Sequence, residues 1–428
     1  MGRLDWAMTS LYPATDALTF EQKLANYADL LVRVGVNLQA GGKLHLNAPI
    51  EAASLVRLIV QKAWEAGAVD VDVNYADQQL SRLMYDHAPE AALDYAPVWG
   101  TERVMHQLDD GYVFLSIAGS DPDLLAGADQ ERIARRSKVT AQQGRPVSER
   151  MGAFQVNWSV GAMPVPSWAA KVFPGLPQDE AISQLWEAIF TVSRADQPDP
   201  VEAWRAHTEQ LARVRDHLNG RRYQALHFKN SHSDVVFGLA DGHLWAGGAW
   251  PAQNGVSGVP NLPTDEVFTA PHRDRIDGYV RASKPLSVRG TLIEDIYMRF
   301  EAGRVVEATA SRGQEALTAL LDTDEGARHL GELALVEYDS PVARTGVLFY
   351  NTLFDENAAS HIALGRAYSF NVEGGTQAET GTAVLAQAGA NDSLIHVDWM
   401  IGTPDTDVDG VYPDGRRESV MRAGKWKF

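Results

Sequence analysis

The side chains best suited to chemistry are carboxylates and imidazoles gathered in the second half of the chain. The candidates are Glu266, Glu332, Glu356, His361, His396 and Asp398. Hard oxygen ligands combined with imidazole nitrogens suit divalent cations, and a pair of such ions can activate water for hydrolysis. The tyrosine Tyr368 follows His361 closely enough to join the same site.

Local patterns place several of these residues together in pairs. LIHVDWM (394–400) reads as a strand, so His396 and Asp398 point to one side and Val397 to the other. LFDENAASHIALGRAYSF (353–370) carries Glu356 and His361 at the entrance to a predicted helix. Tyr368 comes seven residues after His361, close to two helical turns, and would share its face.

Each candidate taken singly also has a structural explanation. Glu266 in NLPTDEVFTAP (261–271) can cap a turn, Glu332 in GELALVEYD (331–339) can end an exposed helix or strand, and His361 can be a hydrogen-bonded helix residue. The HxD strand is harder to explain in this way, because it puts charge on a face that should be buried. Spacing alone does not establish that the six residues meet.

Composition excludes several other classes of protein. The 428 residues contain no Cys, which excludes disulfide frameworks, zinc ribbons, iron–sulfur clusters and a thiol nucleophile. A net charge of −18 argues against nucleic acid or an anionic membrane as partner. The sequence has no GxSxG, GxxxxGK[ST] or HExxH motif and no GxGxxG between a strand and a helix. An EF-hand starting at Asp405 fails because Arg416 stands where glutamate is required.

Targeting signals are also lacking. The start of the chain, MGRLDWAMTSLYPATDALTF (1–20), has no continuous apolar region of the secretory kind. No run of eighteen apolar residues predicts a membrane span. We therefore expect a soluble cytoplasmic protein.

Two kinds of pattern divide the chain near residue 218. In the first part helices alternate with short strands, which predicts a doubly wound α/β domain over 1–218. Thr19 and Gln22 have capping-box spacing ahead of a helix at 20–38. Over 219–428 the period changes to two, which predicts a β-rich α+β domain that carries the metal-binding residues. Hairpin turns are expected at Asp241-Gly242 and Ala302-Gly303.

A basic cluster stands out within this acidic chain. It consists of Arg132, Arg135, Arg136, Lys138, Arg145 and Arg150. The simpler interpretation is a helix face with local salt bridges, and the alternative is a contact between subunits. Aromatic residues that would stack on nucleic-acid bases are not interleaved with these charges.

The segments around the candidate ligands resemble the aminopeptidase T / aminopeptidase S / PepS family of two-metal exopeptidases. The resemblance is carried by NLPTDEVFTAP, GELALV, LFDENAASHIALG and HVDWMIG, and in order and character it extends through FEQKLANYADLLVRVGVNLQAGGKL in the first half. It implies that Glu266, Glu332, Glu356, His361, His396 and Asp398 are the metal ligands, with Tyr368 beside them. It also implies a cytoplasmic homodimer whose active site faces an enclosed cavity.

The resemblance implies release of N-terminal residues from peptides with a free amino terminus. Two divalent ions per chain would activate a water, with zinc favoured and cobalt or magnesium as alternatives. Glu332 is favoured as the carboxylate shared by both ions. Tyr368 would donate a hydrogen bond to the oxyanion, and the proton would be shuttled by Glu266 or by Asp265.

Two other functions fit the same ligand set. One is a different two-metal hydrolase, an amidase or a phosphoesterase, although no obvious Arg/Lys clamp lies beside the ligands apart from Arg344 and Arg366. The other is a non-catalytic dimeric binding protein that keeps the fold. Intact ligands argue against the second alternative.

Overall fold

A computed structural model describes residues 18–288, 291–376 and 381–428. Residues 1–17, on which most of the predicted absence of a secretory signal rests, lie outside the described part. Within the described residues, no helix has the length and apolar character needed to cross a membrane.

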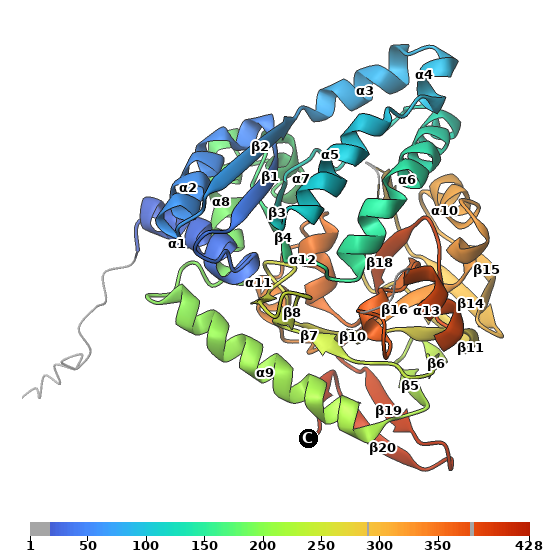
Figure 1. Ribbon diagram of the computed structural model, residues 1–428. Coiled ribbons are helices and arrows are strands. Elements are labelled where there is room, and N and C mark those ends of the chain that lie inside the picture. The colour runs from blue at the N-terminus through green and yellow to red at the C-terminus, as the bar shows by residue number, and fades with distance from the viewer. Residues whose placement is uncertain (1–17, 289–290, 377–380) are drawn as a thin grey trace, which may run out of the picture.

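The first half contains a four-stranded parallel sheet flanked by helices (Figure 1). The strand order is β2 (Asp70–Ala76), β1 (Lys43–Pro49), β3 (Tyr112–Ala118) and β4 (Trp158–Ala162). The main helices are α1 (Phe20–Leu30), α2 (Ala53–Glu65), α3 (Gln78–His87), α4 (Glu90–Asp94), α5 (Val98–Asp109), α6 (Gln130–Gly152), α7 (Pro166–Val172), α8 (Gln178–Val192) and α9 (Pro200–Arg221). The short helical segments are η1 (Leu31–Gly35) and η2 (Ile50–Ala52). The predicted α/β class is confirmed.

Helix α1 begins with the predicted capping box. The Thr19 hydroxyl accepts a hydrogen bond from the Gln22 N–H, and the Gln22 side chain accepts one from the Thr19 N–H. Tyr27, Leu30 and Leu31 are then fully buried at helical spacing. The helix therefore joins the core through the face that the sequence pattern indicates.

The second half is built from antiparallel strands in two large sheets. A five-stranded sheet has the order β18 (His396–Met400), β17 (His361–Gly365), β16 (Leu330–Val336), β10 (Glu266–Thr269) and β7 (Ala246–Gly247). An eight-stranded sheet has the order β15 (Arg304–Thr309), β14 (Tyr297–Glu301), β11 (Pro271–Arg281), β6 (Asp234–Leu239), β5 (Ala225–Lys229), β19 (Asp407–Val411), β20 (Arg417–Arg422) and β21 (Lys425–Trp426).

Shorter elements connect these sheets. Two-stranded ribbons pair β8 (Trp250–Pro251) with β9 (Ser257–Gly258), and β12 (Leu286–Val288) with β13 (Thr291–Ile293). The helices are α10 (Gln314–Leu321), α11 (Pro341–Thr345), α12 (Thr352–Asp355) and α13 (Gly381–Ala388), with short turns η3 (Glu325–Arg328), η4 (Glu356–Ala358) and η5 (Ser369–Asn371).

Two local predictions are wrong. The segment after His361 is strand β17 instead of a helix, because it pairs on both sides, with β16 and with β18. A short apolar run fits either state, and here sheet pairing decides. The turn at Asp241-Gly242 joins β6 to β7, which belong to different sheets, so it closes no hairpin. Ala302-Gly303 does connect paired strands β14 and β15, with positive φ at both residues.

Helix α9 contributes to the hydrophobic cores of both halves. Trp204 is buried in a core that also contains α1, α2 and α8, whereas Leu211, Val214 and Leu218 belong to the core of the β-rich half. The first core also takes in Phe354, just before Glu356. The segments that carry the candidate ligands therefore pack against hydrophobic residues from both halves of the chain.

The loop before β10 is held by β4 of the first half. Val160 N–H donates to Pro260 O at 2.8 Å, and Leu262 N–H donates back to Val160 O at 2.9 Å. The Ser159 hydroxyl donates to Val259 O at 2.8 Å. These bonds attach the segment before Glu266 to the edge of the parallel sheet.

The basic cluster on α6 forms the predicted ion pairs. Arg132 contacts Glu90, Arg135 contacts Glu90 and Asp94, and Arg150 lies 2.7 Å from Asp109. Arg145 lies farther along the helix and pairs with Glu149 and Asp392. The salt-bridge interpretation is confirmed for these four arginines.

Gly365, the last residue of β17, provides a test of how tightly the sheet fixes its ligands. Its φ is +100°, it is paired with His396, and an added Cβ would lie 2.1 Å from Ile395 O. We expect Gly365→Ala to lower the free energy of unfolding by more than about 2 kcal/mol, through backbone strain and a clash with main chain. The measurement is urea unfolding.

Gly415→Ala is the matched control for this substitution. Gly415 also has a positive φ, +82°, but nothing lies within 4 Å of its Cβ position. It should show the strain alone, at about 1 kcal/mol. Equal destabilisation by the two substitutions would contradict the close packing of β17 against the segment before β18.

Candidate metal centre

Strand register places the candidate ligands on one face of the five-stranded sheet. Glu332 on β16 and Asp398 on β18 both pair with Ala363 of β17, so the three residues form a row across the sheet. Directly paired residues in antiparallel strands share a face. The small side chain of Ala363 therefore separates the two carboxylates.

The other strand residues join this face by alternation. His361 lies two residues before Ala363, and His396 lies two residues before Asp398. Glu266 pairs with Val336, which is four residues after Glu332 and on the same face. The structure thus brings together five of the sequence-predicted ligands from four strands.

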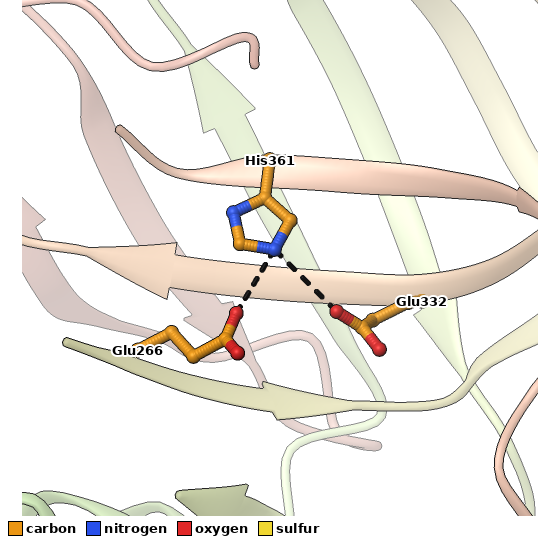
Figure 2. Close-up of side chains that lie close together, drawn as sticks. All are labelled: Glu266, Glu332 and His361. Atoms are coloured by element: carbon orange, nitrogen blue, oxygen red, sulfur yellow. Dashed lines mark ion pairs between the residues drawn. The ribbon is translucent and has the colours of Figure 1, made fainter. Parts of the chain in front are cut away.

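Glu266, Glu332 and His361 form the first cluster (Figure 2). Nε2 of His361 lies 2.9 Å from Oε2 of Glu266 and 3.5 Å from Oε1 of Glu332. One ligand atom from each residue lies within 4.8 Å of the others, the spacing needed to surround one cation.

Glu332, His396 and Asp398 form the second cluster. Nε2 of His396 lies 3.3 Å from Oδ1 of Asp398 and 3.7 Å from Oε2 of Glu332. Glu332 therefore belongs to both clusters, and its two carboxylate oxygens face one histidine each. That arrangement is the one a bridging carboxylate requires.

Backbone carbonyls orient both imidazoles. Nδ1 of His396 lies 2.7 Å from Arg366 O, and Nδ1 of His361 lies 3.2 Å from Ala359 O. A proton on Nδ1 satisfies the carbonyl and leaves Nε2 as a lone-pair donor directed into the cluster. The sequence could not name these orienting groups.

Glu356 approaches the clusters from the side, in the turn η4. It lies outside the two three-residue groups but lines the same small cavity of about 50 Å³ as Glu266, Glu332 and Asp398. Its Oε1 accepts a hydrogen bond of 3.1 Å from the Asn261 side chain. Asn261 was missed as a contributor, although it belongs to the NLPTDE segment.

Burial and mutual repulsion perturb the protonation of these groups. Burial raises the pKa of Glu332 to about 7 despite its contact with His361. Burial, followed by Glu266 and Asp398, raises the pKa of Glu356 well above its usual value. For Asp398, burial is outweighed by His396, which holds the pKa of the carboxyl below its usual value.

Burial lowers the pKa values of the two imidazoles, but neighbouring carboxylates raise them by more. Burial alone lowers the pKa of His361, but Glu266 and Glu332 outweigh it and raise the pKa well above the usual value. For His396, burial is outweighed by Asp398, which raises the pKa to about 9. The site as a whole therefore attracts positive charge.

The donor set fits divalent cations. Glu266, Glu332, Glu356 and Asp398 are each at most 9% exposed, which is costly for four carboxylates without counter-charge. Oε2 of Glu266 and Nε2 of His361 lie 2.9 Å apart as an ion pair without hydrogen-bond geometry, and these two atoms and Oδ1 of Asp398 are buried and make no hydrogen bond to any described residue. Cations coordinated by these atoms would supply both the missing charge and the missing partners.

Tyr368 lies beside the ligands, although it follows a strand and not a helix. Its ring centroid is 4.8 Å from that of His396, and it stacks on Phe370 at 5.3 Å. Burial, with Glu332 and Asp398, raises the pKa of its hydroxyl well above 10. The phenol therefore stays protonated and can donate a hydrogen bond.

Asp265 points away from the carboxylate cavity. Its Oδ1 lies 2.9 Å from Nη2 of Arg194 and 3.2 Å from Nε2 of His207. Its backbone N–H donates to the Asn357 side chain at 2.6 Å. Of the two candidates for proton shuttle, only Glu266 faces the cavity. No sequence signal connected Arg194 or His207 to this segment.

Comparisons with known proteins agree with the resemblance carried by the motifs. The sequence profile of the family described as Thermophilic metalloprotease (M29) matches residues 20–426. Aminopeptidase T of Thermus thermophilus is 50% identical over 407 residues, covering 95% of this chain and 99% of the relative. Aminopeptidase AmpS of Bacillus subtilis is 43% identical over 410 residues, covering 96% of this chain and 100% of the relative.

A solved structure is also similar over nearly the whole chain. Wild-type AmpT from Thermus thermophilus superposes with a TM-score of 0.88 at 48% identity, covering 96% of this chain and 100% of that chain.

The pKa shifts predict how metal-free protein responds to pH. The pKa of Glu332 is raised from 4.5 to about 7, so folded protein binds more protons than unfolded protein between these values. The pKa of His396 is raised from 6.5 to about 9, which extends the effect upward. Stability should therefore fall as pH rises from about 5 to about 9.

Glu332→Gln should remove the lower part of this fall. We expect the variant, treated with chelator, to be about 1–3 kcal/mol more stable than wild type at pH 7 and equal to it near pH 4.5. Denaturant unfolding at several pH values measures this. Glu325→Gln, which changes an exposed carboxylate, is the control. A Glu332→Gln profile parallel to wild type would contradict the rise in the pKa of Glu332 that its burial causes.

Proposed function

The chain belongs to the thermophilic metalloprotease (M29) family and is a metallo-aminopeptidase, and we propose that it works through a two-metal centre. The proposed ligands are Glu266, Glu332, Glu356, His361, His396 and Asp398. The observation that carries the proposal is the position of Glu332, whose two oxygens face separate histidines in two three-residue clusters. We favour zinc, with cobalt or magnesium as alternatives, because imidazoles and carboxylates are mixed in the donor set.

Two divalent cations bound there would lower the pKa of a water to near neutrality and polarise the scissile carbonyl. The free α-amine of a peptide would be held at the same centre through its nitrogen lone pair, because the four carboxylates would already be neutralised by the two dications. Trp158, Phe268 and Phe370 line the same cavity and limit the access of bulk water. The chain would thus select amino termini by their free α-amine and by enclosure.

Two residues are proposed to transfer the proton and to stabilise the oxyanion. Glu266 has an oxygen that makes no hydrogen bond to the described residues and would accept the proton of the attacking water and return it to the leaving amine. Tyr368, which stays protonated, would donate a hydrogen bond to the tetrahedral oxyanion.

We also propose a homodimer and two domains, 1–218 and 219–428. The dimer is supported by exposed apolar side chains that cluster in sequence on α3 and around α4 and α5: Leu80, Leu83, Tyr95, Val98 and Trp99. Exposed apolar patches of this kind commonly mark contacts between proteins. The domain boundary is supported by the change from a parallel sheet before α9 to antiparallel sheets after it.

Metal removal should abolish activity. Protein treated with a chelator and desalted should fail to hydrolyse leucine 4-nitroanilide and regain activity with zinc, cobalt or magnesium. The N-acetylated substrate should not be cleaved, because its amide nitrogen has no lone pair available to the metal centre. Full activity in excess chelator, or failure of every ion to restore it, would contradict the proposal.

The HxD strand should be indispensable to the restored activity. We expect His396→Ala and Asp398→Ala each to lower kcat by more than about a hundredfold, since even residues that only orient a ligand contribute ~10–100-fold. His232→Ala, at an exposed histidine, is the control. Near-normal kcat in either ligand variant would remove that residue from the site.

Tyr368→Phe should lower kcat by about 10²–10³ and change KM little, because an oxyanion contact acts mainly in the transition state. Steady-state kinetics on the same anilide measure the effect. Tyr279→Phe, at an exposed tyrosine, should behave as wild type. A Tyr368→Phe enzyme with unchanged kcat would show that the hydroxyl does not contact the oxyanion.

A further inference from the structure

A second cavity adjoins the carboxylate cavity and is larger, about 320 Å³. The two share Tyr368 and His396 in their walls, so they meet at the proposed reaction centre. The larger cavity lies between α6 of the first half and the segments 366–369 and 393–396 of the second. Figure 1 shows α6 passing beside β18.

The ionisable side chains that line the two cavities differ in the sign of their charge. The smaller one is lined by four carboxylates, Glu266, Glu332, Glu356 and Asp398. The ionisable lining of the larger one, within the described residues, consists of Arg145, Arg366, the shared Tyr368 and the shared His396. The partners of the arginines, Glu149 and Asp392, are not among its lining residues.

The two arginines differ in how firmly they are held. Arg145 makes close ion pairs, Nη2 to Asp392 Oδ2 at 2.5 Å and Nε to Glu149 Oε1 at 3.0 Å. Arg366 lies farther from the same two carboxylates, 3.5 and 3.9 Å away. Within the described residues, its guanidinium donates one long hydrogen bond, 3.4 Å to Ser148 Oγ. Arg145 therefore makes the closer ion pairs with both carboxylates, and Arg366, which shares them at longer distance, keeps N–H donors available for a further hydrogen bond.

Arg366 is also close to the reaction centre along the chain. Its carbonyl oxygen accepts the Nδ1 hydrogen bond of His396, and Tyr368 follows two residues later. Its side chain is 17% exposed, so an ion pair formed there would be partly shielded from solvent. Partly buried, charge-assisted contacts of arginine with carboxylate are strong and directional.

The two ends of a short peptide suit the two adjoining cavities. Its α-amine would be held at the proposed metal centre of the smaller cavity, and its C-terminal carboxylate matches the arginines of the larger one. A cavity of 320 Å³ is at the small end of the range for small-molecule sites, roughly 300–1,000 Å³, so it suits a leaving group of one or two residues. The peptide bond between the two ends would lie where Tyr368 and His396 line both cavities.

We propose that the larger cavity binds the leaving part of the substrate and that Arg366 binds its C-terminal carboxylate, which makes dipeptides and tripeptides with free C-termini the preferred substrates. This inference rests on the proposed aminopeptidase function. Arg366 is a specificity-determining residue, and Arg145 is a positioning residue that makes the closer ion pairs with Asp392 and Glu149.

The test compares two substrates within each enzyme, Leu-Ala and Leu-Ala amide, using metal-loaded protein and detecting released leucine. Wild type should show a kcat/KM for Leu-Ala about tenfold or more above that for the amide, mainly through KM, because one charge-assisted contact is lost. Arg366→Gln should bring the ratio near one. Arg366→Lys keeps the charge but loses the paired, planar N–H donors of the guanidinium, so it should retain part of the preference for Leu-Ala over the amide.

Arg416→Gln is the control, because it removes the same charge from an exposed residue in the turn between β19 and β20. It should keep the wild-type ratio. The ratio is internal to each enzyme, so a partly misfolded variant still reports it. If Arg366→Gln cannot be produced, the wild-type ratio shows whether the enzyme recognises the C-terminal carboxylate. A Leu-Ala methyl ester should then behave like the amide.

Two outcomes would overturn the proposal. Wild type that cleaves both substrates equally does not recognise the carboxylate, and an Arg366→Gln enzyme that keeps the wild-type preference does not use this residue. In both cases aminopeptidase activity remains, so only this inference fails. Absence of leucine release from every substrate, with all three metals supplied, would overturn the proposed function and this inference with it.

Discussion

The structure depends on burying three carboxylates and two imidazoles on one face of a single sheet, with the carboxylate of Glu356 beside them in η4. Glu266, Glu332, Glu356 and Asp398 lie almost entirely out of water, and charges in that position are unfavourable without compensation. The protein supplies only part of the compensation, through the two histidines and through Asn261. Bound cations would supply the remainder, so we expect metal binding to stabilise this face.

The surrounding architecture keeps these groups close despite their repulsion. Sheet pairing fixes Glu332 and Asp398 on either side of Ala363, and backbone carbonyls fix the two imidazole rings. The segment before Glu266 is tied to the parallel sheet of the first half. Hydrogen bonds to the main chain are suited to this purpose, because they do not depend on the protonation state of the ligands.

The sequence predicts well what is local in the chain. The capping box of α1 and the common face of His396 and Asp398 follow from fixed helical and strand periods. The six ligands were proposed from their chemical types and from the family motifs, and the structure brings five of them into two clusters. Glu356, the sixth proposed ligand, lies outside these clusters but lines the same cavity as Glu266, Glu332 and Asp398.

What the sequence could not predict depends on contacts between distant segments. The residues after His361 form a strand because β16 and β18 flank them, and their apolar run alone is compatible with a helix. Asp265 is equivalent to Glu266 in the sequence, but Arg194, 71 residues earlier, holds it on the other side of the strand. The pairing of Arg145 with Asp392 spans 247 residues, and no local pattern predicts it.

We propose that two cations share Glu332. Anomalous diffraction at the zinc absorption edge, from crystals of zinc-loaded protein, can locate them. We expect two peaks about 3.5–4 Å apart, one beside His361 and one beside His396, with the Glu332 carboxylate between them. A single peak, or two peaks that do not both contact Glu332, would contradict the proposal.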